Sequence, residues 1–216
     1  MIFPTYKYEQ QKFLDGVQLV AGVDEVGMSP LAGPVVAAAV ILDPLSISGK
    51  RTKSKWWYRV RDSKTVSELE RESLLGFIQD NCLSFGVGII APQIIDELNI
   101  YHAARLGMKR AVETLSNQPE FIFLDGLGTI KDLEIPQQAV VKGDAKILSI
   151  AAASILAKVT RDRIMNELHE KFPEYGFKNH KGYPTKFHKA ALVIHGPTEF
   201  HRRSFAFVQQ CLGAKV

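Results

Sequence analysis

Four acidic residues follow apolar segments of the chain, where each segment gives way to a turn. Asp24 and Glu25 end the segment VQLVAGVDE, Asp125 follows FIFL, and Asp144 follows AVV after two intervening residues. In open α/β sheets, ligands bind beyond the carboxyl ends of the strands, and a carboxylate buried there is costly unless it has a partner. A divalent cation with oxygen ligands, Mg²⁺ or Mn²⁺, suits these groups. The pattern therefore indicates a carboxylate metal site.

Each acid also has a purely structural explanation. Asp commonly caps helices and turns, and Asp144 stands where it could cap the helix that follows. Neighbours on a regular strand point to opposite faces, so Asp24 and Glu25 share a metal only if the strand ends or bulges there, which Gly27 would allow. Other chemistries lack their motifs: G-x-x-x-x-G-K-[ST], H-E-x-x-H and G-x-S-x-G are all absent from the sequence.

The hydrophobic pattern predicts the elements that position these acids. Strands are expected at 17–24, 35–42, 83–90, 121–124 and 139–141. Helices are expected from a capping box at Ser67, over 91–116 with a break near Leu98–Asn99, over 145–172, and last from Thr185 to Gly196. Strands that come first and then alternate with helices indicate a single α/β or α+β domain.

Composition and charge narrow the function further. The 216 residues are 46% hydrophobic and 23% charged, as in globular proteins, and neither a signal-peptide pattern nor an apolar run long enough to span a membrane is present. We therefore expect a soluble, cytoplasmic protein, by default a monomer. The net charge is +4, and basic residues concentrate at 50–64, around Trp56 and Trp57, and at 178–203. Both clusters suit a polyanion such as nucleic acid, although for 50–64 a solvated loop with buried aromatics is slightly favoured.

Seven motifs along the chain closely resemble those of ribonuclease HII. They are Gly22-Val23-Asp24-Glu25-Val26-Gly27 with Pro30-Leu31-Ala32-Gly33-Pro34-Val35-Val36, Asp62-Ser63-Lys64, Leu124-Asp125-Gly126, Lys142-Gly143-Asp144-Ala145-Lys146, Ala151-Ala152-Ala153-Ser154-Ile155-Leu156-Ala157-Lys158 with Arg161-Asp162, His180-Lys181-Gly182-Tyr183-Pro184-Thr185, and His201-Arg202-Arg203-Ser204-Phe205. They occur in the family's order and extend from about residue 21 to residue 205, nearly the whole chain.

The resemblance implies an α/β fold, a ribonuclease H-like mixed sheet flanked by helices, with a C-terminal helical extension. We expect one domain over 1–216, with a catalytic core at about 17–172 and a substrate-binding extension at about 173–216. The implied activity is endonucleolytic cleavage of RNA in RNA–DNA hybrids and at single ribonucleotides embedded in duplex DNA, leaving 5′-phosphate and 3′-hydroxyl ends.

The resemblance also implies roles for particular residues. The family's catalytic and metal-binding acids correspond to Asp24, Glu25, Asp125 and Asp144, the same four that the strand-end pattern selects, and they would hold two Mg²⁺ or Mn²⁺ ions. Tyr183 would pack on the sugar beyond the ribonucleotide. Lys64 and the basic 178–203 stretch would hold phosphates.

The chain departs from the family at the loop after its first acids. Gly27 is normally followed by Arg-Gly, and in ribonuclease HIII the loop reads Gly-Lys-Gly, whereas here Met28 and Ser29 follow. Backbone contacts of Gly27, Met28 and Ser29 to the ribonucleotide could survive, but a charged contact is lost and Ser29 carries a side chain where backbone approaches closely. We therefore expect weaker substrate binding. The segment 46–60 is longer than the family's connection and could add duplex contacts.

Three other interpretations remain open on the sequence alone. One is a ribonuclease HIII-like hybrid nuclease without junction preference, although only about twenty residues precede the first motif. Another is a catalytically inactive hybrid-binding protein, which the presence of all four acids disfavours. A general nucleic-acid binder would leave those acids without a purpose. The tail after Phe207 could dock a sliding clamp, but it is too short a signal to claim.

Overall fold

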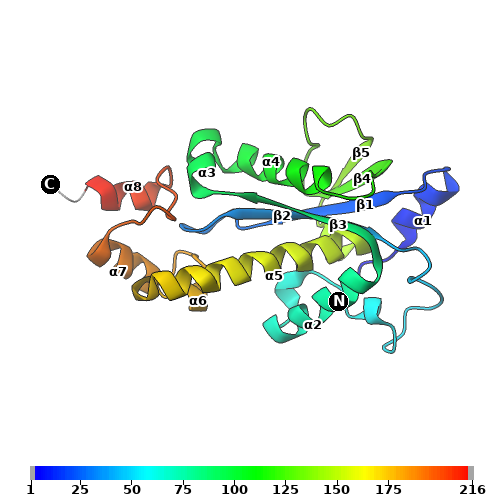
Figure 1. Cartoon of the computed structure of the whole chain (residues 1–216), viewed down its shortest axis with the longest axis horizontal. Helices are drawn as coiled ribbons and strands as arrows, with labels where there is room; N and C mark the ends of the chain where they lie inside the picture. The colour runs from blue at the N-terminus through cyan, green and yellow to red at the C-terminus, as the bar shows by residue number, and fades with distance from the viewer. Residues whose placement is uncertain (1–2, 214–216) are drawn as a thin grey trace.

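Five strands form one mixed sheet in the computed structural model, which describes residues 3–213 (Figure 1). The strands are β1 (Val20–Val26), β2 (Val35–Leu42), β3 (Cys82–Ile90), β4 (Phe121–Asp125) and β5 (Gln137–Val140). Their order is β3-β2-β1-β4-β5. Strand β2 is antiparallel to β1 and β3, whereas β1, β4 and β5 run parallel. All five expected strands are present, although β1 covers 20–26 rather than 17–24 and β5 covers 137–140 rather than 139–141. The carboxyl ends of the three parallel strands meet at one edge of the sheet.

The structure has eight α-helices within residues 3–213. They are α1 (Lys7–Leu14), α2 (Glu68–Asp80), α3 (Pro92–Leu98), α4 (Ile100–Glu113), α5 (Leu148–Lys171), α6 (Phe177–His180), α7 (Lys186–His195) and α8 (Ala206–Gly213). The predicted N-caps are confirmed at Ser67 and Thr185, whose hydroxyls accept from the backbone N–H of Glu70 and His188. The predicted break is confirmed at Asn99, which caps α4. The prediction that the Thr185 helix is the last one was wrong, because α8 follows it.

None of these helices is both long and apolar enough to cross a bilayer, over the part of the chain that the structure describes.

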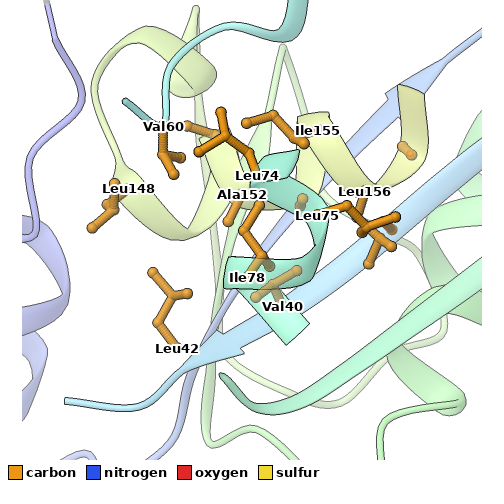
Figure 2. Close-up of a cluster of buried hydrophobic side chains, with 14 of the residues drawn as sticks. Val40, Leu42, Val60, Leu74, Leu75, Ile78, Leu148, Ala152, Ile155 and Leu156 are labelled. Carbon is orange, nitrogen blue, oxygen red and sulfur yellow. The ribbon is translucent and has the colours of Figure 1, made fainter. Parts of the chain in front are cut away.

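Helices α5 and α4 cover opposite faces of the sheet. Alanines keep α5 narrow, and it approaches β1 so closely that a Cβ on Gly22 would lie 2.2 Å from the backbone of Ser149. Helix α2 completes this layer by inserting Leu74 and Ile78 between α5 and β2, as Figure 2 shows. On the opposite face, Met108 of α4 packs on the inner strands. Hydrophobic cores on both faces of the sheet therefore hold the edge at which the parallel strands end.

Helix α5 begins at Leu148, three residues later than predicted. Lys142 adopts a left-handed conformation (φ +54°), and a 3₁₀ turn (Gly143–Ala145) intervenes before the helix. The Glu9 carboxylate of α1 accepts a hydrogen bond from the Ser149 N–H in the first turn of α5 (2.9 Å). The interpretation of Asp144 as the cap of this helix was therefore wrong.

The segment after α5 packs as a C-terminal helical layer of its own. Its core contains Tyr175, Phe177, Leu192 and Val208, together with Met165 from the end of α5. Backbone hydrogen bonds tie this layer to the loop between β1 and β2, from Leu31 N–H to the Gly182 carbonyl and from Arg202 N–H to the Leu31 carbonyl, both 2.8 Å long. The C-terminal layer is therefore hydrogen-bonded to the β1–β2 loop, which follows Asp24 and Glu25.

Candidate active site

The four acids line one cleft of about 240 Å³ at the carboxyl edge of the sheet. Asp24 and Glu25 lie on β1, Asp125 is the last residue of β4, and Asp144 lies in the 3₁₀ turn after β5. The remaining cleft residues are Val26, Gly27, Met28, Ser29, Ser63, Lys64, Ser154, Lys158 and Tyr183. The structure thus brings together all nine residues that the sequence analysis selects.

Strand β1 does not bulge at its acids; of the two expected possibilities the structure shows the strand ending, one residue after Glu25. Its antiparallel pairing with β2 continues without a shift through Asp24, Glu25 and Val26. The two side chains diverge as on any regular strand: Asp24 lies near the Ser154 hydroxyl of α5, which favours its ionised form, whereas Glu25 lies within the electrostatic influence of Arg105 on α4. Both reach the same cleft because β1 ends one residue after Glu25.

Burial and mutual repulsion raise the pKa of three of the four carboxyl groups. Burial, followed by repulsion from Glu25 and Asp125, raises the pKa of Asp24 well above its usual value. Burial and Asp125 raise the pKa of Glu25 to about 6 and that of Asp144 also to about 6. A bound cation would relieve these penalties, because it favours the ionised carboxylates.

The donor set fits a hard divalent cation, since the cleft offers carboxylate oxygens and no thiolate or imidazole. Two of those oxygens already accept hydrogen bonds from backbone N–H groups. Asp24 Oδ1 accepts from Glu25 (2.7 Å), and Asp125 Oδ1 accepts from Gly143 (2.6 Å). Within residues 3–213, no three acidic, histidine or cysteine side chains already surround one point closely enough to hold an ion. Ion binding would therefore require the carboxylates to rotate toward one another.

Two buried arginines hold the loop that borders the cleft. Arg202 donates to the carbonyls of Gly27 (2.6 Å), Met28 (3.1 Å) and Gly33 (3.0 Å), and Arg161 donates to those of Ala32, Pro34 and Lys181. Both side chains are 0% exposed. Sequence reasoning missed this role, although both arginines lie inside the quoted motifs.

The loop conformation explains which of its residues must be glycine. Gly27 has φ +96°, and a Cβ there would lie 2.5 Å from Arg161 Nε and 2.8 Å from the Pro34 carbonyl oxygen. Met28 and Ser29 both have negative φ, so their side chains cause no backbone strain. Ser29 is exposed and Met28 half-buried, so the loop accommodates this unusual pair with its backbone still facing the cleft.

The prediction that the basic 178–203 stretch holds phosphates was wrong for several of its members. Arg202, Lys181, His188 and His201 are buried and bond to the protein itself. Lys181 Nζ, for example, donates to Asn166 Oδ1 (2.7 Å). The exposed cations of the stretch are Lys178, Lys186, Lys189 and Arg203. Burial of these histidines and arginines was not visible in the sequence, because it depends on packing between α5, α7 and the β1–β2 loop.

Lys64 and Tyr183, which are far apart in the sequence, both line the cleft. Lys64 sits in a 3₁₀ turn (Ser63–Thr65) capped by Asp62. Burial lowers the Lys64 pKa, but the carboxylates of Asp62, Asp24 and Asp144 outweigh it, so the pKa is raised and the ammonium is retained. Tyr183 is 38% exposed, which argues against a core aromatic and leaves its ring accessible to a ligand.

Besides Val26, three polar cleft residues were not selected from the sequence. The hydroxyls of Ser63 and Ser154 are 2.9 Å apart, and the Ser154 hydroxyl lowers the pKa of the nearby Asp24. Lys158 lies one turn further along α5 and donates to Asp162 (2.5 Å). Spacing of four residues on α5 could have indicated that Ser154 and Lys158 share one helix face.

The basic, aromatic run at 50–64 folds mainly onto the protein. Trp57 is buried, and the Arg51 guanidinium lies over the rings of Phe3, Trp57 and Tyr58 and donates to the carbonyls of Tyr58 and Val60. The interpretation of a loop with buried aromatics is therefore confirmed for Trp57. Lys53 remains exposed.

Known proteins resemble this chain along nearly its whole length. The sequence model of the ribonuclease HII family matches residues 21–208. Ribonuclease HII of Bacillus mycoides (strain KBAB4) is 47% identical over 207 residues, which cover 95% of this chain and 76% of that protein. The crystal structure of ribonuclease H2 from Pyrococcus horikoshii OT3 matches with a TM-score of 0.75 at 27% identity, over 91% of this chain and 98% of that one.

A more distant structure, Bst-RNase HIII in complex with Mn²⁺, matches with a TM-score of 0.67 at 18% identity, over 91% of this chain and 70% of that one. These matches confirm the ribonuclease H-like mixed sheet with C-terminal helices. The family match spans the sheet, the acidic cleft and the C-terminal layer alike. Together with a relative nearly half identical in sequence, it shows that the chain belongs to the ribonuclease HII family of endoribonucleases.

Proposed function

We propose that this endoribonuclease cleaves both RNA–DNA hybrids and duplex DNA containing a single ribonucleotide, using two Mg²⁺ or Mn²⁺ ions and leaving 5′-phosphate and 3′-hydroxyl ends. The observation that carries the proposal is the composition of one cleft, in which four carboxylates lie beside the Gly27–Ser29 loop and Tyr183. The carboxylates would bind the metal ions, and the loop and the tyrosine would contact the ribonucleotide and the sugar next to it.

Asp24, Glu25, Asp125 and Asp144 would hold the ions. When bound, divalent cations activate a water as nucleophile and stabilise the leaving 3′ oxygen. Asp24 would be the acid shared between the two ions; it is the most buried of the four and lies within the electrostatic influence of the other three. The nearby hydroxyl of Ser154 favours the ionised form of Asp24, and Lys64 keeps its positive charge for a phosphate of the cleaved strand.

Recognition of the ribonucleotide must depend on its 2′-hydroxyl, which separates RNA from DNA. The backbone of Gly27, Met28 and Ser29 would read that group, and the Tyr183 ring would pack on the next sugar and favour deoxyribose there. Residues 173–216 would act as the substrate-binding extension of one domain, with the core at 17–172. We propose that the chain acts as a monomer.

Three labelled duplexes test this function, each incubated with Mg²⁺ and with Mn²⁺. They contain no ribonucleotide, one ribonucleotide, or a run of several ribonucleotides in one strand. We expect no cleavage of the first and cleavage of the other two, with the single-ribonucleotide duplex cut on the 5′ side of that residue. End-group analysis should find 5′-phosphate and 3′-hydroxyl products.

Two results would contradict the proposal in different ways. Cleavage of the run alone would show that Met28 and Ser29 have removed junction recognition, as in the ribonuclease HIII-like alternative. No cleavage with either ion, in a preparation that binds the hybrid, would indicate the inactive hybrid-binding alternative.

A further inference from the structure

A second and larger hollow lies beside the catalytic cleft, between α4 and the loop that follows β4. Its volume is about 490 Å³. We call it the α4 groove, and its lining residues are Tyr101, His102, Arg105, Leu106, Lys109, Gly128, Thr129, Ile130, Lys131 and Asp132. The loop stands on the α4 side of the sheet in Figure 1. None of its lining residues belongs to the sequence motifs quoted above, although Gly126 of one motif lies near them in the chain.

The charged groups that line the α4 groove are mostly cations. Arg105, Lys109 and Lys131 line it, with His102 beside them, against the single carboxylate of Asp132. Lys109 has only a long contact to Glu113 (3.9 Å), one turn away on the same exposed face, and such pairs contribute little. Among residues 3–213, neither Arg105 nor Lys131 makes a salt bridge. The groove therefore offers three cations to an anion from outside.

Arg105 is held in place although it lacks a carboxylate partner. Its guanidinium lies 5.5 Å from the centre of the Tyr101 ring, and its Nη2 donates to the Leu127 carbonyl (3.3 Å). The Tyr101 hydroxyl donates to the same carbonyl (3.2 Å). A fixed cation loses less conformational entropy when it binds an anion.

The chain links the groove to the catalytic cleft, and Arg105 of the groove lies within electrostatic range of a cleft acid. The loop of the groove begins directly after Asp125, the acid at the end of β4. Arg105 also influences Glu25, whose pKa it lowers against the effects of burial and Asp125. The groove therefore lies on the side of the cleft where β4 ends, within reach of the flanking part of a long anionic chain held at the four acids.

We propose that the α4 groove binds the phosphodiester backbone of the substrate duplex on one side of the cleavage site, with Arg105, Lys109 and Lys131 contacting successive phosphates. This rests on the proposed function of the cleft. A duplex matches the groove better than a small anion does, because three cations spread along a helix and a loop correspond to a repeating charge. Such contacts give affinity without reading sequence.

The test is the salt dependence of duplex binding by a Lys109→Gln/Lys131→Gln double variant. Binding of a labelled duplex with one central ribonucleotide is followed by fluorescence anisotropy in EDTA, which prevents cleavage, over a range of NaCl concentrations. We expect Kd to rise about tenfold at moderate salt. The plot of log Kd against log salt should become less steep by about 1.8, which is about 0.9 for each lost phosphate contact.

A matched control is the Lys7→Gln/Lys171→Gln double variant. It removes the same charge from two exposed lysines outside the groove and the cleft, and it should retain the wild-type slope. Two half-length duplexes, each ending near the ribonucleotide on one side, locate the contact. The groove variant should weaken binding of only one of them, because the groove lies on one side of the cleft.

An unchanged slope in the groove variant, or equal weakening of both half-length duplexes, would overturn this assignment. Such a result leaves the cleft itself untouched, as long as the wild-type protein binds and cleaves the ribonucleotide duplex. Failure of the wild-type protein to cleave would instead contradict the proposed function. The two hypotheses therefore fail through different measurements.

Discussion

Asp24 combines deep burial with a negative environment, and this makes it costly to the fold. It is 5% exposed, and repulsion from three other carboxylates adds to burial in raising its pKa. An acid whose folded pKa is raised destabilises the folded state once it ionises. Retention of such a residue is explained by ligand binding, since stability alone would favour a neutral side chain.

Replacing Asp24 with asparagine should separate its contribution to ion binding from its cost to stability. In Asp24→Asn the shape and the Ser154 contact can persist, but a charged ion ligand is lost. We expect turnover to fall at least about a hundredfold and Tm at pH 7 to stay equal or rise. Single-turnover cleavage and thermal denaturation measure the two. Asp80→Asn, on an exposed helix end, is the control, and retained cleavage in Asp24→Asn would contradict the assignment.

Met28 occupies the position where the family pattern has arginine, and its half-buried side chain packs on the cluster around Val35 and Ile90. A Met28→Arg variant should gain a phosphate contact. We expect a lower KM and a salt dependence steeper by about 0.9, measured on the single-ribonucleotide duplex. Met28→Leu keeps the apolar contact without charge, so it should behave like the wild type. Identical KM and salt dependence in Met28→Arg would refute this explanation of the loop.

At the scale of elements, the β1–β2 loop depends on a guanidinium that comes from the other end of the chain. Arg202→Lys should lose most of the hydrogen bonds to Gly27, Met28 and Gly33, because lysine lacks the planar fork. We expect a stability loss of about 2–4 kcal/mol. More specifically, kcat/KM for the single-ribonucleotide duplex should fall about tenfold more than for a run of ribonucleotides.

That ratio separates positioning of the loop from general destabilisation, which would reduce both activities alike. Arg203→Lys is the matched control, since Arg203 is the exposed neighbour and its replacement should preserve the ratio. If Arg202→Lys also preserves the ratio, Arg202 has no role in ribonucleotide recognition.

The elements themselves were largely predictable because local patterns determine them. The buried strand at 35–42 and the caps at Ser67 and Thr185 required only neighbouring residues. The start of α5 was misplaced because its first turn is satisfied by Glu9, which is about 140 residues earlier. The continuation of β1 past Asp24 depends on pairing with β2. Sequence thus located the four acids, but the buried arginines and the α4 groove arise from contacts between distant segments.

In the whole molecule, a chain of hydrogen bonds through two buried histidines ties Tyr183 to the rest of the C-terminal layer. The Thr198 N–H donates to His201 Nδ1 (3.0 Å), the His188 and His201 Nε2 atoms are 3.1 Å apart, and His188 Nδ1 contacts the Tyr183 carbonyl (2.9 Å). This order assigns one proton to each ring: His201 Nε2 donates to His188, and His188 Nδ1 donates to Tyr183. Both imidazoles must therefore be neutral.

Acid should loosen this layer. Burial lowers the pKa of His188 to about 4 and that of His201 to about 3. Because these values lie below the unfolded value of about 6.5, the unfolded state binds more protons, and stability decreases as pH falls below about 6.5. Protonation of Glu9, whose pKa burial raises to about 7, opposes this trend, so the wild-type protein alone cannot isolate the histidines.

The comparison of His188→Gln with the wild-type protein does isolate them. Between pH 6.5 and 4.5, the free energy of unfolding of the wild-type protein should fall more steeply than that of His188→Gln, by at most about 1.4 kcal/mol per pH unit, the limit for one histidine. Denaturant titrations at several pH values measure it. His195→Gln, at an exposed imidazole, should retain the wild-type slope. Parallel pH profiles for the wild type and His188→Gln would mean that His188 accepts a proton without disrupting the layer that presents Tyr183.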